Sequence, residues 1–430
     1  MTTKKKSLIK FMIGSFALAC CFMMPSGTKA ASEATANAVS PGAISIENIK
    51  KNEDEVKALD KIIDEHVNAP AYIRAKRDDI NNEEYYKWSE DGHLISINLD
   101  NLHINGEFSF EEFPELEIIY CRYNGFKKID ISKNNKLKKL YCIGNLLTEI
   151  NTSNNPELMV LRCPWNKIET LDLKNNKKLI TLGANGNNLY AIDVSNNTYL
   201  KRIHLKYNNI TAINLKNNTM LEKFTIHCNE LNQIDLSNNT GLKKINCGYN
   251  QIVKLDLSNN ILIESVKCVQ NEITDLNIRG CSNLKEINCT FNKIQNIDLK
   301  DAVKLIYFKA NLNKLENIDL SKCSLLRDIE CCNNRLTTID VSSNINLYSL
   351  DVTSNHLTSL DVSNCKKLKK LRCGINKLTG KLDLSKTTRL YDVDCDYNNL
   401  QSIDITGCTK LIDDEGGYNV TYDMGVTFIK

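Results

Sequence analysis

The chain has 430 residues, of which 55 are basic and 52 acidic, and 42% are hydrophobic. This length exceeds one ordinary globular domain, and the composition is that of an ordered protein. Residues 1–30 contain five lysines and no acidic residue, so the remaining chain has 50 basic against 52 acidic residues, a charge of about −2. Because no basic excess remains, we expect no nucleic-acid partner.

Residues 1–30 are predicted to be a secretory signal. Lysines at 4–6 and 10 precede an apolar run over 11–24, and small side chains follow up to a cleavage site after Ala30. The run is short for a membrane span, so we expect no such span and a secreted, extracellular protein. Cys20 offers a weaker alternative, attachment as a lipoprotein. No sorting motif or apolar helix precedes Lys430, so release from the cell is the expected outcome.

Residues 31–48 are small and polar and are predicted to be a linker. A helix is expected over 52–68, where Asn52 and Glu55 have the spacing of a capping box. Alternation of Ile95, Ile97 and Leu99 with polar residues then predicts a strand.

From Leu116 the sequence repeats every 21 residues, with the pattern L-x-x-L-x-C-x-x-N-x-L-x-x-L-D-L-S-x-N-x-x. Fourteen units of 21 or 22 residues fill 116–410, and a degenerate unit fills 411–430. Position 9 is asparagine in all fifteen, from Asn124 to Asn419, and we expect these side chains to stack as a ladder that hydrogen-bonds backbone groups of the turn. Positions 1, 4, 6, 11, 14 and 16 are apolar and should point inward, where stacking of units buries them.

This pattern resembles the leucine-rich-repeat family, and its nested halves of ten and eleven residues resemble the internalin-like bacterial proteins. The resemblance implies a right-handed solenoid with a parallel sheet on its concave face. We therefore expect a mostly parallel β solenoid with strands on both faces and a short helical N-terminal cap within 49–115. In that cap Trp88 and three phenylalanines should cover the first unit's core: Phe108, Phe110 and Phe113. Residues 411–430 should cap the other end.

Thirteen of the fifteen cysteines after the signal occupy two repeat positions, nine at position 6 and four at position 19. We interpret these thirteen as small buried hydrophobes, because stacked residues on parallel strands suit a disulfide poorly. Cys228 and Cys332 lie outside this pattern. Cys228 adjoins His227, with His204 one unit earlier, so a Cys/His or zinc site is the alternative to surface scatter.

Position 15 is aspartate in eleven units and asparagine in three, and calcium binding is one reading of this column. The favoured reading is that these side chains accept backbone hydrogen bonds where the chain turns. We expect no metal and no cofactor.

Positions 3, 5, 7 and 8 should point outward from the concave sheet. Position 8 carries an aromatic residue in every second unit, from Tyr123 to Phe291. The face is basic in the early units and acidic in the late ones. The candidate binding residues are Tyr123, Trp165, Arg202, His204, Lys206, Tyr207, His227, Tyr249 and Phe291. The competing reading is that these aromatics only pack on neighbouring units.

These features predict a non-catalytic, monomeric binding protein that recognises a protein through its concave face. The internalin-like resemblance suggests a host or cell-surface protein as this partner. A glycan that stacks on the aromatic column is the alternative ligand, and a purely structural surface protein is a further one. An enzyme is disfavoured, because the chain contains no nucleophile–base motif and the repeats leave little room for a catalytic domain.

Overall fold

A computed structural model describes residues 49–65, 79–411 and 419–430 of the chain. The predicted signal, the linker and Cys20 therefore lie outside the described residues, as does much of the degenerate last unit. Residues 49–430 form one compact unit, and the description below concerns that unit alone.

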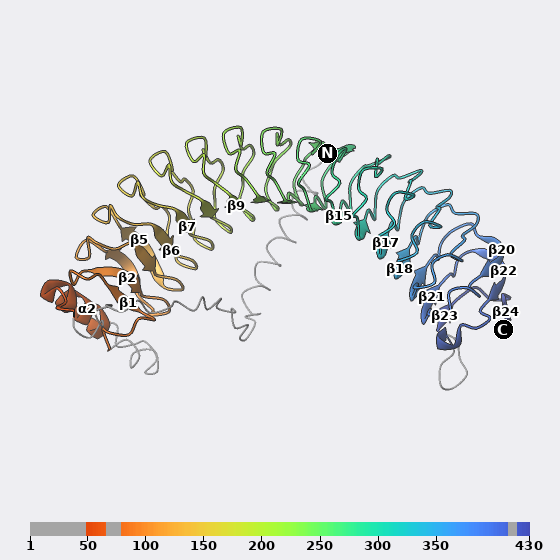
Figure 1. Cartoon of the computed structure of the whole chain (residues 1–430), viewed down its shortest axis with the longest axis horizontal. Coiled ribbons are helices and arrows are strands. Elements are labelled where there is room, and N and C mark those ends of the chain that lie inside the picture. The colour runs from red at the N-terminus through yellow and green to blue at the C-terminus, as the bar shows by residue number, and fades with distance from the viewer. Residues whose placement is uncertain (1–48, 66–78, 412–418) are drawn as a thin grey trace, which may run out of the picture. The chain divides into compact units, whose positions relative to one another are not determined.

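The main sheet has 17 strands, one for nearly every unit. Each strand pairs in parallel with that of the next unit, 21 or 22 residues later in most pairs, and only β1 and β2 are antiparallel. These strands line the inner side of the curved stack of repeats (Figure 1). In order they are β1 (Tyr86–Trp88), β2 (Leu94–Asn98), β4 (Ile118–Tyr120), β6 (Lys139–Tyr141), β7 (Val160–Arg162), β8 (Thr181–Gly183), β9 (Arg202–His204), β10 (Lys223–Thr225), β11 (Lys244–Asn246), β13 (Ser265–Lys267), β15 (Glu286–Asn288), β16 (Tyr307–Lys309), β17 (Asp328–Glu330), β18 (Ser349–Asp351), β19 (Lys370–Arg372), β21 (Asp392–Asp394) and β23 (Val420–Thr421).

Among the described residues, strands also form on the opposite side of the repeats in three places. They are the pair β3 (Asn105–Ser109) and β5 (Gly125–Asp130), the pair β12 (Lys254–Asp256) and β14 (Asp275–Asn277), and the trio β20 (Thr379–Asp383), β22 (Asn399–Asp404) and β24 (Thr427–Ile429). Elsewhere among the described residues the second half of the unit forms no strand. A local turn follows in units with and without these strands: the N–H of Asn197 donates to the carbonyl of Val194 at 3.0 Å, and that of Asn260, just after β12, donates to Leu257 at 2.8 Å. The predicted fold class is confirmed, with fewer strands on this side than the pattern suggested.

The core is a continuous column of the predicted inward positions. In the unit that begins at Leu158, the side chains of Leu158, Leu161, Cys163 and Ile168 are all fully buried. Most three-residue strands of the main sheet bury their middle residue between two more exposed ones, as in β9 and β10. One unit alone cannot shield such a row, so the stack is the folding unit.

The N-terminal cap consists of helix α2 (Glu53–Glu65), β1 and β2. Asn52 caps the helix through its Oδ1, which accepts the N–H groups of Asp54 and Glu55. The capping-box prediction is wrong in its second part, the reciprocal bond between the Glu55 side chain and the backbone N–H of Asn52. That buried carboxylate instead accepts the N–H of Leu94 at 2.6 Å and contacts His93 Nδ1 at 2.8 Å. Trp88, Phe110 and Phe113 are buried and Phe108 is half-buried.

Two columns of buried asparagines connect neighbouring units. At position 9, Asn208 Nδ2 donates to the carbonyls of Ala184 and Leu205, and its Oδ1 accepts the N–H of Leu189. At position 19, Asn218 Nδ2 donates to two carbonyls, but its Oδ1 has no partner. The predicted ladder at position 9 is confirmed, and the second ladder was not predicted.

All fifteen cysteines among the described residues are free thiols. The position-6 thiols are buried as predicted, and burial raises the pKa of Cys163 to about 12. The position-19 cysteines do more than fill space, because they replace asparagine in the second ladder. The Cys281 Sγ, for example, lies 3.5 Å from the carbonyl oxygen of Leu257 and donates to it weakly.

The aspartate column at position 15 is explained by local turns. The Oδ1 of Asp235 accepts the N–H of Ser237 at 2.9 Å, and Asn214 makes the same bond to Lys216 at 3.0 Å. The backbone bond lowers the pKa of Asp235. The favoured reading of this column, as acceptors of backbone hydrogen bonds, is confirmed.

Candidate functional site

The outward positions 3, 5, 7 and 8 of each unit form one surface, which we call the strand face. Parallel pairing without offset places equal positions side by side, so that Arg162, Gly183 and His204 form one row. The strand face therefore consists of straight rows of side chains, one residue from each repeat.

Position 8 has a left-handed backbone in all fourteen units where it is described, with φ between 51° and 66°. Only glycine, asparagine and aspartate adopt this conformation readily. Eight of these fourteen residues are nevertheless large apolar side chains that remain exposed. They are Tyr123, Trp165, Tyr207, Tyr249, Phe291, Leu312, Ile375 and Tyr397.

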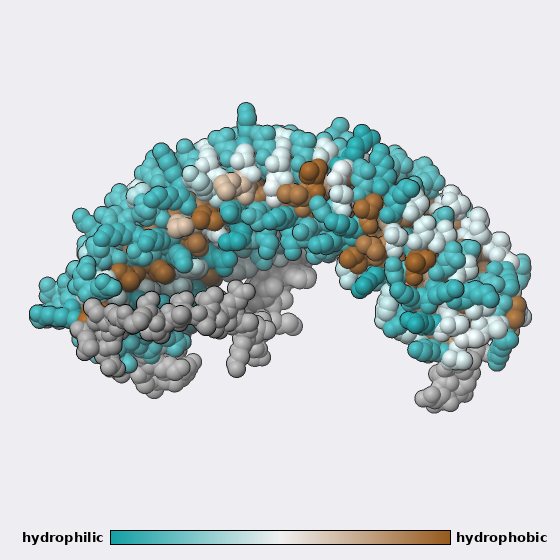
Figure 2. Space-filling model, viewed as in Figure 1, coloured by the Kyte–Doolittle hydropathy of each residue, from teal (hydrophilic) through white to brown (hydrophobic). Residues whose placement is uncertain are grey.

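Exposure of this row matches the prediction for its aromatic members. Trp165 and Tyr123 are each 51% exposed and Phe291 is 52% exposed. Figure 2 shows hydrophobic residues scattered between hydrophilic ones on the visible side of the stack. The large side chains of position 8 line up because parallel pairing places equal positions side by side. Apolar groups that line up on a surface in this way are typical of interaction sites.

The two glycines of the row, Gly144 and Gly186, make room for the preceding aromatic ring. A Cβ on Gly186 would lie 2.4 Å from a ring carbon of Trp165, and one on Gly144 would lie 2.8 Å from the Tyr123 ring. The Trp165 ring thus lies over Gly186 and reaches Tyr207, with 5.9 Å between ring centroids. The aromatics therefore pack on neighbouring units and also remain exposed.

Tyr207 lies at the centre of a small cluster. The His227 ring meets it edge-on at 5.5 Å, and the Lys206 ammonium lies 5.6 Å from its ring centroid. His204 contacts Thr225 Oγ1 through Nδ1 at 2.9 Å. Burial is the largest cause that lowers the pKa of both histidines, to about 4 for His227, so both are neutral at pH 7.

Charge is distributed along the strand face as the sequence indicated. In the main sheet, outward positions of the strands β6 to β11 and of β13 contain cations and no carboxylate. Late units carry acidic residues that are partly paired, as Arg372 with Asp392 at 3.0 Å and Lys309 with Glu330 at 2.7 Å. Burial and Asp394 raise the pKa of Asp396.

The Cys228–His227 pair has the wrong electrostatics for a nucleophile. Burial raises the pKa of the Cys228 thiol to about 11 and lowers that of His227 to about 4. A reactive cysteine needs the opposite shift, toward thiolate at neutral pH. Among the residues the structure describes, no group of three or more histidine, cysteine or acidic side chains could hold a metal ion.

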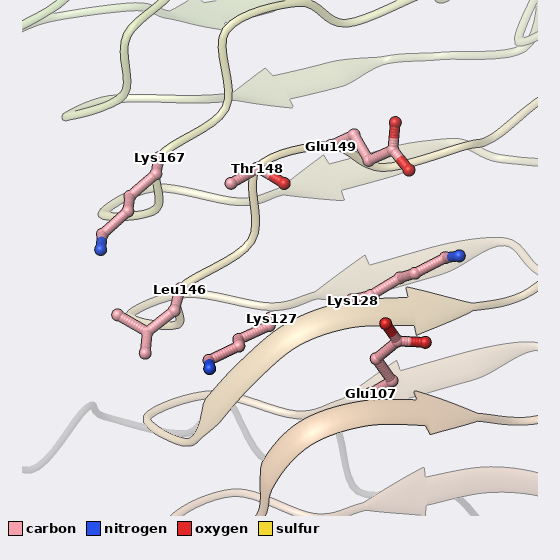
Figure 3. A pocket seen from close by; sticks show the side chains of 7 residues that line it. All are labelled: Glu107, Lys127, Lys128, Leu146, Thr148, Glu149 and Lys167. Carbon is pink, nitrogen blue, oxygen red and sulfur yellow. The ribbon is translucent and has the colours of Figure 1, made fainter.

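A shallow hollow lies away from the strand face. It is an open depression lined by alternating charges (Figure 3), namely Glu107, Lys127, Lys128, Leu146, Thr148, Glu149 and Lys167. Its mixed charges and openness do not resemble the mostly apolar, enclosed site of a small-molecule ligand.

The structure brings six of the nine candidate residues together: Trp165, Arg202, His204, Lys206, Tyr207 and His227. Within the described part of the chain, no ring contact joins Tyr123, Tyr249 or Phe291 to another aromatic side chain. Sequence reasoning missed the left-handed backbone and the role of the glycines. Glycine in alternation with aromatics at position 8 was the signal that could have indicated both.

No helix among the described residues has the length and apolar character needed to cross a bilayer.

Comparison with known proteins identifies related solved structures. No family model and no curated protein matches the chain. The functional domain of InlJ from Listeria monocytogenes, which includes a cysteine ladder, is 30% identical with a TM-score of 0.68, over 72% of this chain and 69% of that one. An internalin (inlF) from Listeria monocytogenes str. 4b F2365 is 22% identical with a TM-score of 0.57, over 75% and 96%. The plant peptide hormone receptor RGFR1 in complex with RGF2 is 21% identical with a TM-score of 0.64, over 76% and 61%. The last two likenesses show the shared fold.

Proposed function

This chain belongs to the internalin family of leucine-rich-repeat proteins, and from that premise we propose that it is a secreted, non-catalytic protein that binds a protein partner on its strand face. The partner we have in view is a host or cell-surface protein, bound by a monomer of this chain. Secretion is supported by the signal-like residues 1–30.

The observation that carries the proposal is the row of exposed apolar side chains at position 8. Each bulky residue there costs roughly 1–2 kcal/mol relative to glycine in left-handed backbone. The repeat tolerates glycine at this position, as Gly144 and Gly186 demonstrate. Because folding alone would favour glycine throughout, retention of large exposed side chains supports a role in binding.

Photocrosslinking tests which face is used. A benzoylphenylalanine placed at Tyr249 should crosslink a partner protein when the whole chain is exposed to candidate cell surfaces. The same group at Lys300, an exposed residue in the second half of a unit, serves as the matched control. Equal crosslinking from both positions would contradict binding on the strand face.

Secretion has its own test. The whole chain expressed in a bacterial host should be found in the medium, and a chain that lacks residues 1–30 should stay inside the cells. Equal distribution of both chains would contradict the signal assignment.

A further inference from the structure

We propose that the strand face around β7, β8 and β9 binds an anionic carbohydrate through a cluster that we call the arginine–aromatic patch: Arg162, Trp165, Gly186, Arg202, Lys206 and Tyr207. The proposal goes beyond protein binding, because its ligand is an acidic sugar that should bind without any protein attached.

The patch is built around one unit with unusually small outward side chains. Thr181, Gly183 and Gly186 are these residues, and all three residues of β8 are buried. Their neighbours in the flanking units are long. Arg202 Nε donates to Thr181 Oγ1 at 3.2 Å, and a Cβ on Gly183 would lie 3.5 Å from Arg162 Cγ. The two arginines thus lie on either side of the unit that begins at Leu179, which we call the low unit because of its small outward side chains.

The aromatic part of the patch spans the same low unit. Trp165 lies against Gly186, whose missing Cβ permits this position, and half of its surface remains exposed. Tyr207 continues the platform at a tilt of 32° to the Trp165 ring. Electron-rich ring faces attract partly positive C–H groups, which sugars present on the faces of their rings.

Positive charge surrounds this platform. Among the described residues, no carboxylate forms an ion pair with Arg162, Arg202 or Lys206. After burial, the causes that lower the pKa of His204 are Arg162, Lys223, Arg202 and Lys206. These cations therefore act on the same small area, where an anionic group of a ligand would be stabilised.

The charge and shape of the patch indicate an anionic carbohydrate. Its acidic groups can bind the cations, which have no carboxylate partners among the described residues, and its sugar rings can stack on the open faces of Trp165 and Tyr207. Aromatics recur at every second unit, roughly 10 Å apart along the sheet, so an extended polymer can contact more than one of them.

A glycan array tests the ligand class. The whole chain is applied to glycans that carry uronic acid, sialic acid or sulfate, printed beside neutral glycans of equal length. We expect acidic glycans to be bound and neutral ones not, with affinity that falls as salt is raised. Failure to bind any acidic glycan, or equal binding of neutral ones, would overturn the proposal.

Two glycine variants test the geometry. Gly186→Ala should displace the Trp165 ring and weaken binding about tenfold, as should Trp165→Ala. Gly144→Ala is the matched control, because it introduces the same backbone strain but meets the Tyr123 ring instead. Binding that is unchanged in Gly186→Ala, or reduced equally in Gly144→Ala at equal melting temperature, would contradict the assigned platform.

Two further probes separate the sources of the ligand. A free acidic oligosaccharide should bind as tightly as the same glycan carried on a protein, and a requirement for the protein would overturn a sugar site. A twelve-residue polyglutamate peptide should bind more weakly than the glycan. Equal binding of the peptide, unaffected by Trp165→Ala, would show charge attraction alone.

Discussion

Asparagine side chains make different hydrogen bonds in the two ladders. At position 9 the amide uses both its NH₂ group and its oxygen, as Asn208 does, and no unit replaces this residue. At position 19 the oxygen of Asn218 is buried without a partner. A thiol can supply the donor, as Cys281 does, so cysteine fits there in place of asparagine.

Two matched substitutions test this difference. Asn208→Cys leaves the buried N–H of Leu189 without its acceptor and should lower the free energy of unfolding by about 3 kcal/mol. Asn218→Cys keeps a donor and should cost less than about 1 kcal/mol. Chemical denaturation of both variants measures the two costs. Equal costs would show that the unpaired oxygen at position 19 does not govern the choice of residue.

Single residues on the strand face could be predicted only in part. A period of 21 placed Tyr123 and Trp165 in one column and correctly expected both to be exposed. Their left-handed backbone follows from the tight turn between the strand and the asparagine at position 9, which the pattern alone does not reveal. The contact of Trp165 with Gly186 depends on a neighbour 21 residues away, so only a three-dimensional structure shows it.

Among the elements, the N-terminal cap has a titrating contact. The hydrogen bond to Glu55 raises the pKa of His93 above its ordinary value. Protonated His93 therefore stabilises the fold fully below its unfolded pKa of about 6.5, and this contribution is lost as pH rises through the folded value. The capping-box prediction failed because Glu55 satisfies strand β2 instead of the helix terminus.

The melting temperature between pH 5.5 and 8 checks this contact. It should fall as pH rises in the native chain. Glu55→Gln should flatten that dependence, because the charge beside His93 is removed. The variant should still fold, since a glutamine oxygen can accept the N–H of Leu94. An unchanged slope in Glu55→Gln would assign the dependence to other groups.

The turns of the second half respond to acid in the opposite direction. Backbone hydrogen bonds lower the pKa of Asp193 and Asp235, so their contribution is present above about pH 4 and is lost as pH falls through the folded value. Asp235→Asn should retain stability at pH 7 and lose part of this acid sensitivity, as measured by denaturation at pH 3 and 7.

A chelator should leave the melting temperature unchanged, whereas a rise in melting temperature on addition of calcium would favour calcium binding by the aspartate column.

At the scale of the whole molecule, periodicity made the fold predictable and left the site open. Inward positions must match between neighbouring units, so their apolar residues recur visibly from Leu116 to Leu411. Outward positions carry no such constraint, and their residues differ from one unit to the next. The distribution of strands on the second side was also hidden, because the second half has the same apolar pattern in units with and without these strands.

The central claim is that the exposed row at position 8 serves binding and is not needed for folding. It is tested most directly by one triple variant, Trp165→Gly, Tyr207→Gly and Phe291→Gly, in which melting temperature and partner crosslinking from benzoylphenylalanine at position 249 are measured on the same preparation. Glycine relieves the left-handed strain, so we expect an unchanged or higher melting temperature together with loss of crosslinking. A lower melting temperature with crosslinking retained would contradict it.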